Sequence, residues 1–284
     1  MKKLKWLSAI IIILNFNLIA IGQEKQQLND LAFHLKKEGN YKSALKEYLR
    51  LYYFDEENNF IHASKEIAEC FVALEDSKNA LKYYDLYFFK LKYNDPERNE
   101  VRFAKQKLLL IDGEANKALA EVLQVNKSSL QDFDKYYFML SFNYLIANQN
   151  VKAKAGLKNL SYFNKIDTLK LNNKLKDLNK NFKKNPKNAK WYSMALPGLG
   201  QAINGDVVDG LKSFTLYVGF IALFIDLQSD LGLADSALTI GPWISRYYIG
   251  GLGNAVKSAK RKKYNKQQKL LLDIVNIVQL AKDK

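Results

Sequence analysis

The chain has 284 residues, of which 48% are hydrophobic, so a folded protein with one or two domains is expected rather than a disordered one. Its formal net charge of +15 predicts an anionic partner, although lysine-rich, solvated helix faces explain much of that charge equally well. A single cysteine (Cys70) excludes an intrachain disulfide, and two histidines (His34 and His62) without ligand neighbours predict neither a metal site nor a cofactor.

Residues 1–22 have the pattern of an export signal. Lys2, Lys3 and Lys5 precede an apolar core over 7–21, and Ala20 and Gly22 are small residues at the positions that a signal peptidase needs. The core is shorter than the ~20 residues of a comfortable membrane span, which favours cleavage after Gly22 over retention as an N-terminal anchor. Either outcome predicts an exported protein that faces the periplasm.

Residues 23–185 are predicted to form helical repeats. Apolar residues recur at helical spacing, and a turn followed by an alanine returns four times, at intervals of about 35–38 residues. A glycine or asparagine at such a turn ends the first helix, and a small alanine in the second helix lets the pair approach closely. The turn and packing positions are Gly39, Tyr41, Ala44, Ala80, Gly113, Ala118 and Ala153.

This pattern resembles the tetratricopeptide repeat, a helix-turn-helix of ~34 residues that stacks into a solenoid. The chain departs from it at Glu75, where glycine is usual, and in lacking the tryptophan of the first helix. The resemblance implies a concave side of first helices, bearing tyrosines and lysines, that binds a protein or peptide. A polar helix over 167–184 is expected to cap the solenoid, and the break at 183–188 is expected to be the domain boundary.

Residues 186–263 are predicted to form a hydrophobic helical hairpin, followed by an amphipathic helix over 264–284. A stretch rich in proline, glycine and asparagine (193–210) precedes two apolar runs, 213–225 and 236–256. An acidic, turn-like segment (226–235) separates these runs, and a basic segment (257–269) follows them. The expected head-group contacts are Lys257, Lys260, Arg261, Lys262 and Lys263.

The module resembles an uncharacterised family of membrane-associated domains in bacterial envelope proteins, which often follow a signal peptide and tetratricopeptide-like repeats. The resemblance implies membrane association and no established activity; Ile203 stands where the family usually has a tyrosine. The residues that carry it are Pro197, Gly198, Gly200, Gln201, Asn204, Gly205 and Gly210, then Tyr247, Tyr248, Gly250, Asn254, Ala255 and Ala259.

Three placements of the hairpin remain open from the sequence. It spans the bilayer, lies in one leaflet with its lysines on anionic head groups, or forms a buried helical pair without lipid. The first apolar run gives only ~20 Å of helix against ~30 Å of hydrocarbon. With an exported N-terminus, a spanning hairpin would also leave the basic segments outside, against the positive-inside rule. Arg246, at membrane depth, is expected to face the partner arm or a polar group.

No catalytic set is predicted. Gly198 to Gln201 lacks the lysine and hydroxyl residue of a phosphate-binding loop, and the basic cluster beside apolar runs favours lipid over nucleic acid. The expected protein is therefore all-α and not an enzyme: an exported, periplasm-facing scaffold whose repeats bind an envelope protein or peptide and whose hairpin holds it at a membrane. The alternative is a membrane-embedded assembly or biogenesis factor in which the hairpin is the active part. The sequence indicates neither the oligomeric state nor which membrane is involved.

Overall fold

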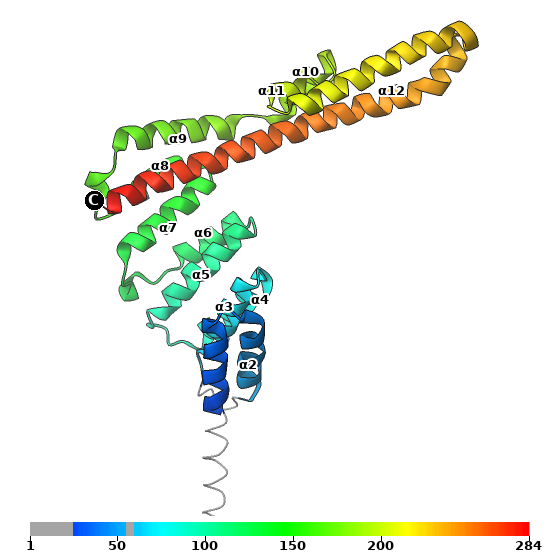
Figure 1. The fold of residues 1–284 in the computed structure, drawn as a ribbon. Coiled ribbons are helices and arrows are strands. Elements are labelled where there is room, and N and C mark those ends of the chain that lie inside the picture. Colours follow the sequence, from blue (N-terminus) through cyan, green and yellow to red (C-terminus); the bar gives the residue numbers. More distant parts are fainter. Residues whose placement is uncertain (1–24, 55–59, 284) are drawn as a thin grey trace, which may run out of the picture. The chain divides into compact units, whose positions relative to one another are not determined.

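The computed structural model describes residues 25–54 and 60–283 (Figure 1). Every regular element in these ranges is helical and no strand occurs in them, which confirms the all-α prediction. The chain divides into two compact units, which we call unit 1 (through Leu160) and unit 2 (from Ser161). The predicted signal segment over 1–22 lies outside the described residues.

Unit 1 consists of helices that follow one another as antiparallel hairpins (Figure 1). Its first helix occupies residues 25–37 and pairs with the helix that follows it. The remaining elements are α2 (Tyr41–Phe54), α3 (Ala63–Ala73), α4 (Ser77–Lys90), α5 (Glu97–Ile111), α6 (Ala115–Leu123), the 3-10 turn η1 (Lys127–Ser129), α7 (Phe133–Ile146) and α8 (Asn150–Leu157).

The four hairpin turns share one backbone geometry. Each contains a residue in the left-handed region: Gly39 (φ 78°), Glu75 (φ 60°), Gly113 (φ 78°) and Asn148 (φ 57°). In each turn, the backbone N–H of the residue that follows the left-handed residue bonds to a carbonyl five residues earlier, as in a Schellman cap. These bonds run from Asn40 to Leu35, Asp76 to Phe71, Glu114 to Leu109 and Gln149 to Tyr144, at 2.7–2.9 Å.

Each turn leads into a second helix, and the fourth residue of that helix is a fully buried alanine. Ala44, Ala80, Ala118 and Ala153 are all 0% exposed. Large side chains one turn further along, such as Tyr48 and Tyr84, fill the space between successive helices. Cys70 is buried in the first core cluster, and burial raises the pKa of its thiol to about 11. It is therefore a packed apolar side chain rather than a reactive thiol.

Unit 2 is dominated by α12 (Val207–Lys282), which is broken at Gly232, where φ is 81° and ψ is 168°. We call residues 207–231 the first arm, 233–282 the second arm and 226–235 the tip. Figure 1 shows the two arms running antiparallel, with the first in yellow and the second in orange to red. The other elements are η2 (Phe163–Lys165), α9 (Thr168–Lys183), η3 (Pro186–Asn188), α10 (Ala189–Ala195) and α11 (Leu199–Ile203).

The division of the chain differs from the expected one. The predicted boundary lay between 185 and 186, with the polar helix capping the repeats, but α9 packs along the end of the second arm, within unit 2 (Figure 1). Lys174 forms an ion pair with Asp273 (2.7 Å), and the Asn181 amide donates to the Lys263 carbonyl (3.0 Å). The narrow leucine stripe of α9 therefore faces the amphipathic end of α12. That end is also continuous with the hairpin, without a break at 263–264.

Candidate membrane interface

The two arms of α12 expose long apolar surfaces. Leu216, Val218 and Ile225 on the first arm are 48%, 47% and 62% exposed, and Leu238 and Ile249 on the second are 76% and 66% exposed. Within the described residues, α12 alone is long and apolar enough to cross a membrane, and only 6% of its apolar window is buried. Of the three placements left open by the sequence, a buried helical pair does not fit this structure, because most of these side chains are exposed.

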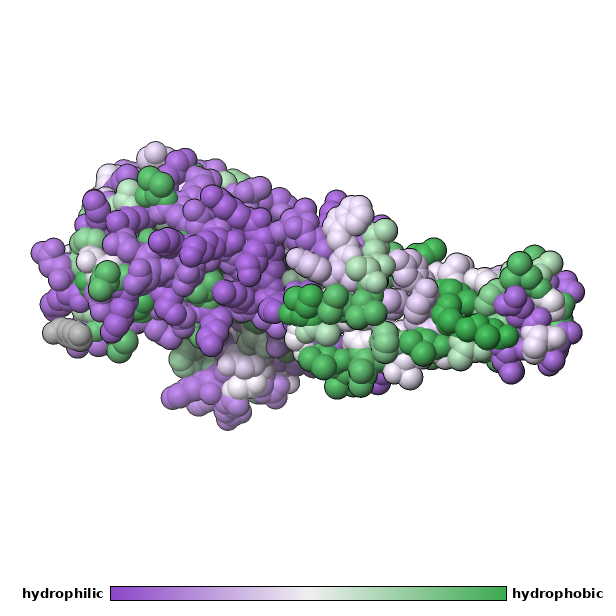
Figure 2. Space-filling model, turned by 90° about the horizontal axis from the view of Figure 1, so that it is seen from above, coloured by the Kyte–Doolittle hydropathy of each residue, from purple (hydrophilic) through white to green (hydrophobic). Residues whose placement is uncertain are grey.

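The arms differ from the tip in polarity. Figure 2 shows hydrophobic residues gathered along the arms and hydrophilic residues at the tip. The tip carries Asp226, Asp230 and Asp235, all exposed. The expected turn is a single sharp break at Gly232, and helix continues on both sides of it. The backbone φ at Gly232 is positive, a conformation in which a residue with a side chain would be strained. Helix also continues through Pro242.

Aromatic side chains join the arms above their base. Phe220 packs against Tyr247 with ring centroids 5.0 Å apart, and Tyr217 packs against Tyr248 at 5.8 Å. The Tyr248 hydroxyl also donates to the backbone carbonyl of Met194 in α10 (3.0 Å). The two tyrosines of the predicted motif therefore contribute differently: both rings contact the first arm, and Tyr248 also holds α10.

The glycines of the predicted motif form a tightly packed group at the base of the hairpin. A Cβ on Gly198 would lie 1.9 Å from the Gly210 carbonyl oxygen, and a Cβ on Gly210 would lie 2.6 Å from the Gly198 oxygen. A Cβ on Gly200 would lie 2.4 Å from the Ala189 oxygen and 2.8 Å from the Ala255 Cβ. Four chain segments therefore meet here, at distances from Gly198, Gly200 and Gly210 that leave no room for a side chain.

Gln201 joins this group to both arms through hydrogen bonds. Its side chain is 1% exposed, and its Nε2 donates to the Ser213 hydroxyl (3.1 Å) and to the Gly251 carbonyl (3.3 Å). Its Oε1 accepts from the Ser193 hydroxyl (3.2 Å), which accepts in turn from the Gly200 N–H (2.9 Å). A buried amide with every group paired fixes a single arrangement of its neighbours. We call Ser193, Gly198, Gly200, Gln201 and Gly210 the base cluster.

The remaining motif residues lie around the base cluster. The Asn204 amide donates to the Gly200 carbonyl (2.6 Å), and Gly205, with a φ of 98°, ends α11. Pro197 precedes Gly198 in the link between α10 and α11. Gly250 and Asn254 are exposed on the second arm, and a Cβ on Gly250 would meet nothing within 4 Å. The close backbone approach at motif glycines therefore occurs at Gly198, Gly200 and Gly210 and not at Gly250.

The basic residues after the second apolar run do not act as one group. Lys262 donates to the Ile203 carbonyl at the end of α11 (2.9 Å), and Lys263 donates to the Phe182 and Lys184 carbonyls at the end of α9 (2.7 and 2.8 Å). Cations at helix C-termini satisfy free carbonyls and oppose the helix dipole. Three of the five expected head-group contacts therefore have protein partners, since Arg261 pairs with Asp206.

Asp206 is held as a carboxylate by this arrangement. The Ser258 hydroxyl and the Arg261 guanidinium beside it lower the pKa of the carboxyl below its ordinary value. Lys257 and Lys260 differ from Arg261, because neither has an ion pair or hydrogen bond within the described ranges, although all three are exposed. Of the five expected head-group contacts, these two remain available for an external anion.

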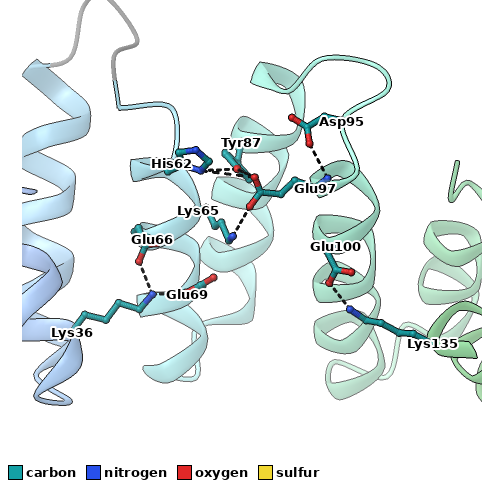
Figure 3. Close-up of polar contacts among 10 residues, drawn as sticks. All are labelled: Lys36, His62, Lys65, Glu66, Glu69, Tyr87, Asp95, Glu97, Glu100 and Lys135. Atoms are coloured by element: carbon teal, nitrogen blue, oxygen red, sulfur yellow. Dashed lines mark hydrogen bonds and ion pairs between the residues drawn. The ribbon is translucent and has the colours of Figure 1, made fainter. Parts of the chain in front are cut away.

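In unit 1, ion pairs link the first helices of successive hairpins (Figure 3). Lys36 contacts Glu66 (2.5 Å) and Glu69 on α3, and Lys65 on α3 contacts Glu97 on α5 (2.5 Å). The row continues from Glu100 on α5 to Lys135 on α7. Lys36, Lys65 and Lys135 lie on the side that is expected to bind a partner, and each is thus already matched by a carboxylate of a neighbouring hairpin.

Glu97 lies at the centre of this row. It accepts a hydrogen bond from the Tyr87 hydroxyl, which also contacts His62 Nδ1 (2.8 Å), and its backbone N–H bonds to Asp95 (Figure 3). Burial alone would raise the pKa of the Glu97 carboxyl, but the hydrogen bonds from Lys65 and Tyr87 outweigh it and lower that pKa. Burial, together with the hydrogen bond to Glu97, raises the pKa of Tyr87. Burial alone would lower the pKa of Lys65, but its hydrogen bond and charge interaction with Glu97 outweigh burial and raise that pKa.

The part of the chain that the structure describes holds no group of three or more histidine, cysteine, aspartate or glutamate side chains placed to bind a metal ion. The sequence did not predict Ser193 and Ser213 as the hydroxyl partners of Gln201, because the position of a single serine in the sequence does not indicate whether its hydroxyl forms a buried hydrogen bond. Comparison of the chain with protein-family models, curated proteins and solved structures finds no significant match to any of them.

Proposed function

We propose that this protein is an exported, non-enzymatic helical scaffold of the cell envelope, anchored by the α12 hairpin and presenting unit 1 to an envelope protein or peptide. The observation that carries the proposal is the contrast within unit 2. The arms expose apolar side chains, whereas their base is fixed by the fully paired Gln201 amide. In water such arms would be an aggregation hazard, so lipid is their natural environment.

The dimensions of the arms favour a hairpin that spans the bilayer over one that lies in a single leaflet. At 1.5 Å per residue, about 27 Å of helix separates Lys212 from Asp230, and about 33 Å separates Asp235 from Lys257. These lengths bracket the ~30 Å hydrocarbon core. Between those charged limits Asp226 and Arg246 are the only charges, whereas a helix lying in the interface needs a continuous polar face.

The repeat architecture supports the scaffold part of the proposal. The four turns with positive φ and the four buried alanines recur as in tetratricopeptide-like hairpins, which commonly bind peptides or proteins. A row of charged side chains on the first helices is already paired from one hairpin to its neighbour. A partner would therefore be recognised by tyrosines and other exposed apolar side chains, such as Phe33 (59% exposed), more than by free lysines.

Membrane fractionation of the tagged full-length protein tests the anchor. We expect the protein to stay in the membrane pellet after carbonate and high-salt washes. The Ile249→Glu variant should move to the soluble fraction, because a carboxylate in the hydrocarbon costs about 3 kcal/mol. Leu280→Glu is the matched control: Leu280 is similarly exposed (64% against 66%) on the same helix but lies beyond the apolar run 236–256 of the second arm. Complete release of the wild type by salt would contradict the anchor.

Cysteine labelling in sealed membrane vesicles tests the spanning arrangement. A Ser229→Cys variant places a thiol at the tip and a Gln268→Cys variant places one beyond the base, while buried Cys70 serves as the unreactive background. If the hairpin spans the bilayer, an impermeant maleimide will label the two sites from opposite sides. Labelling of both from the same side would support a hairpin within one leaflet.

A further inference from the structure

A charged groove lies between the two arms, next to the base cluster. Its volume is about 830 Å³, and both arms line it, together with Gln201 and Asp206. Four of its lining residues are cationic: Lys212, Arg246, Lys257 and Arg261. Two carboxylates, Asp206 and Asp209, face them, so the groove has an excess of positive charge.

Three of these cations have no protein counter-ion. Arg261 is paired with Asp206, but Lys212, Arg246 and Lys257 form no ion pair or hydrogen bond with any described residue. The Asp209 side chain is one carboxylate for these three cations. The Ser213 hydroxyl donates to the backbone carbonyl of Asp209 and not to its carboxylate. The groove is therefore short of negative charge by about two units, which a bound anion would supply.

Because Arg246 is one of these cations, the lack of negative charge in the groove is energetically unfavourable in a membrane. It stands midway between Asp235 and Lys257 in the sequence, in the middle of the second apolar run. An arginine at such depth requires a partner group or contact with the head-group region. Arg246 lines the groove together with residues of the first arm, the arm that it was expected to face, but no described residue forms an ion pair or hydrogen bond with it. A partner for the guanidinium would therefore come from outside the described residues.

The surroundings of the groove indicate what that partner is. Trp243 (49% exposed) and Tyr247 (45% exposed) flank Arg246, and the groove runs from there to Lys212 and Lys257 at the charged, head-group end of the arms. A phosphate that enters from that end can meet the long Arg246 side chain, because arginine extends its guanidinium toward the interface. Gly250 and Gly251, which line the groove, present no side chain, and a Cβ at either would meet nothing within 4 Å. A phosphate can approach the backbone here while acyl chains lie along the exposed leucines of the arms.

We propose that this groove binds the phosphate head group of an anionic phospholipid, with Arg246, Lys212 and Lys257 as the phosphate ligands. A guanidinium binds phosphate oxygens through two parallel hydrogen bonds, and the two ammonium groups add charge without fixed geometry. The inference rests on the proposed membrane anchor and adds to it a specific lipid class and site.

The test uses the full-length protein in a neutral detergent. Thermal unfolding is followed during titration with short-chain phosphatidylglycerol, short-chain phosphatidylcholine or inorganic phosphate. We expect phosphatidylglycerol to raise the Tm at concentrations at least tenfold lower than the other two. Arg246→Gln and Lys257→Gln should each raise the concentration needed by about tenfold, the effect of losing ~1.4 kcal/mol. Arg246→Lys should retain part of the effect.

The control is Lys266→Gln, which removes one exposed charge from the same helix outside the groove. It should leave the response to phosphatidylglycerol unchanged. Equal responses to phosphatidylglycerol and phosphatidylcholine would overturn the site, and so would an equal loss in Lys266→Gln, which would indicate diffuse attraction. A full effect of inorganic phosphate would replace the lipid with a soluble anion. Because Arg246→Gln should still resist carbonate extraction, failure of the site is distinguishable from failure of the anchor.

Discussion

The Nε2 atom of Gln201 donates a hydrogen bond to the backbone carbonyl of Gly251, 50 residues further along the chain, at 3.3 Å. This contact joins the short helix α11 to the second arm, and the bond from the same nitrogen to Ser213 joins it to the first arm. One buried amide thus holds the base of an otherwise exposed hairpin.

We expect Gln201→Leu to destabilise unit 2 by about 2–3 kcal/mol, because it keeps the size of the side chain but leaves the Gly251 carbonyl and two hydroxyls without their partner. Urea unfolding followed by the fluorescence of Trp191 and Trp243, both in unit 2, measures the change. The control is Gln228→Leu, at an exposed position in the tip. Equal stability of the two variants would show that the hydrogen bonds of Gln201 contribute nothing net.

Alanine substitutions should separate the two groups of glycines. Gly200→Ala forces a Cβ to within 2.4 Å of the Ala189 oxygen, and we expect a loss of about 1–3 kcal/mol from overpacking. Gly250→Ala meets open space in a helix, so it should be neutral or stabilising by up to ~1 kcal/mol. The same unfolding measurement compares them. A tolerated Gly200→Ala would contradict the close packing of α11 against α10 and the second arm.

Removing one hydroxyl should distinguish the adjacent tyrosines. Tyr248→Phe loses the bond to the Met194 carbonyl, and we expect a cost of about 1 kcal/mol in the unfolding of unit 2. Tyr247→Phe keeps the ring contact with Phe220 and removes no described hydrogen bond, so its stability should equal that of the wild type. A larger loss in Tyr247→Phe would indicate an external partner for its hydroxyl.

Acid should weaken unit 1 through Glu97. Its folded pKa lies below its ordinary value of 4.5, so the stabilisation is complete above pH 4.5 and is lost as pH falls through the lower, folded value. Denaturant unfolding of unit 1, followed by circular dichroism, should show a flat profile near neutral pH and a decline below pH 4.5. Glu97→Gln should reduce stability at neutral pH by about 1 kcal/mol or less and flatten that decline.

The control for this prediction is Glu114→Gln. Glu114 forms only an exposed pair with Lys117, with the two side chains 50% and 68% exposed, and its removal should change neither the stability nor its pH dependence. If the stability of Glu97→Gln declines below pH 4.5 as steeply as that of the wild type, the acid sensitivity comes from other carboxylates in the row of ion pairs.

The sequence by itself determined the helical class, the positions of the four turns and the two apolar runs, because each of these depends on local pattern. A left-handed residue must end a helix wherever the chain reverses, and Gly39 and Gly113 could be found from spacing alone. Even Glu75, which departs from the glycine pattern, adopts the same positive φ, since the neighbouring helices fix the backbone there.

Only the tertiary structure decided what depends on contacts between distant residues. It placed α9 on the second arm, paired Gln201 with Ser193, Ser213 and Gly251, and engaged Lys262 and Lys263 at the ends of other helices. It also showed that Arg246 has no counter-ion among the described residues. Composition shows how many charges and amides a segment carries, but which of them are satisfied is a property of three-dimensional proximity, and that decides which remain free to bind something else.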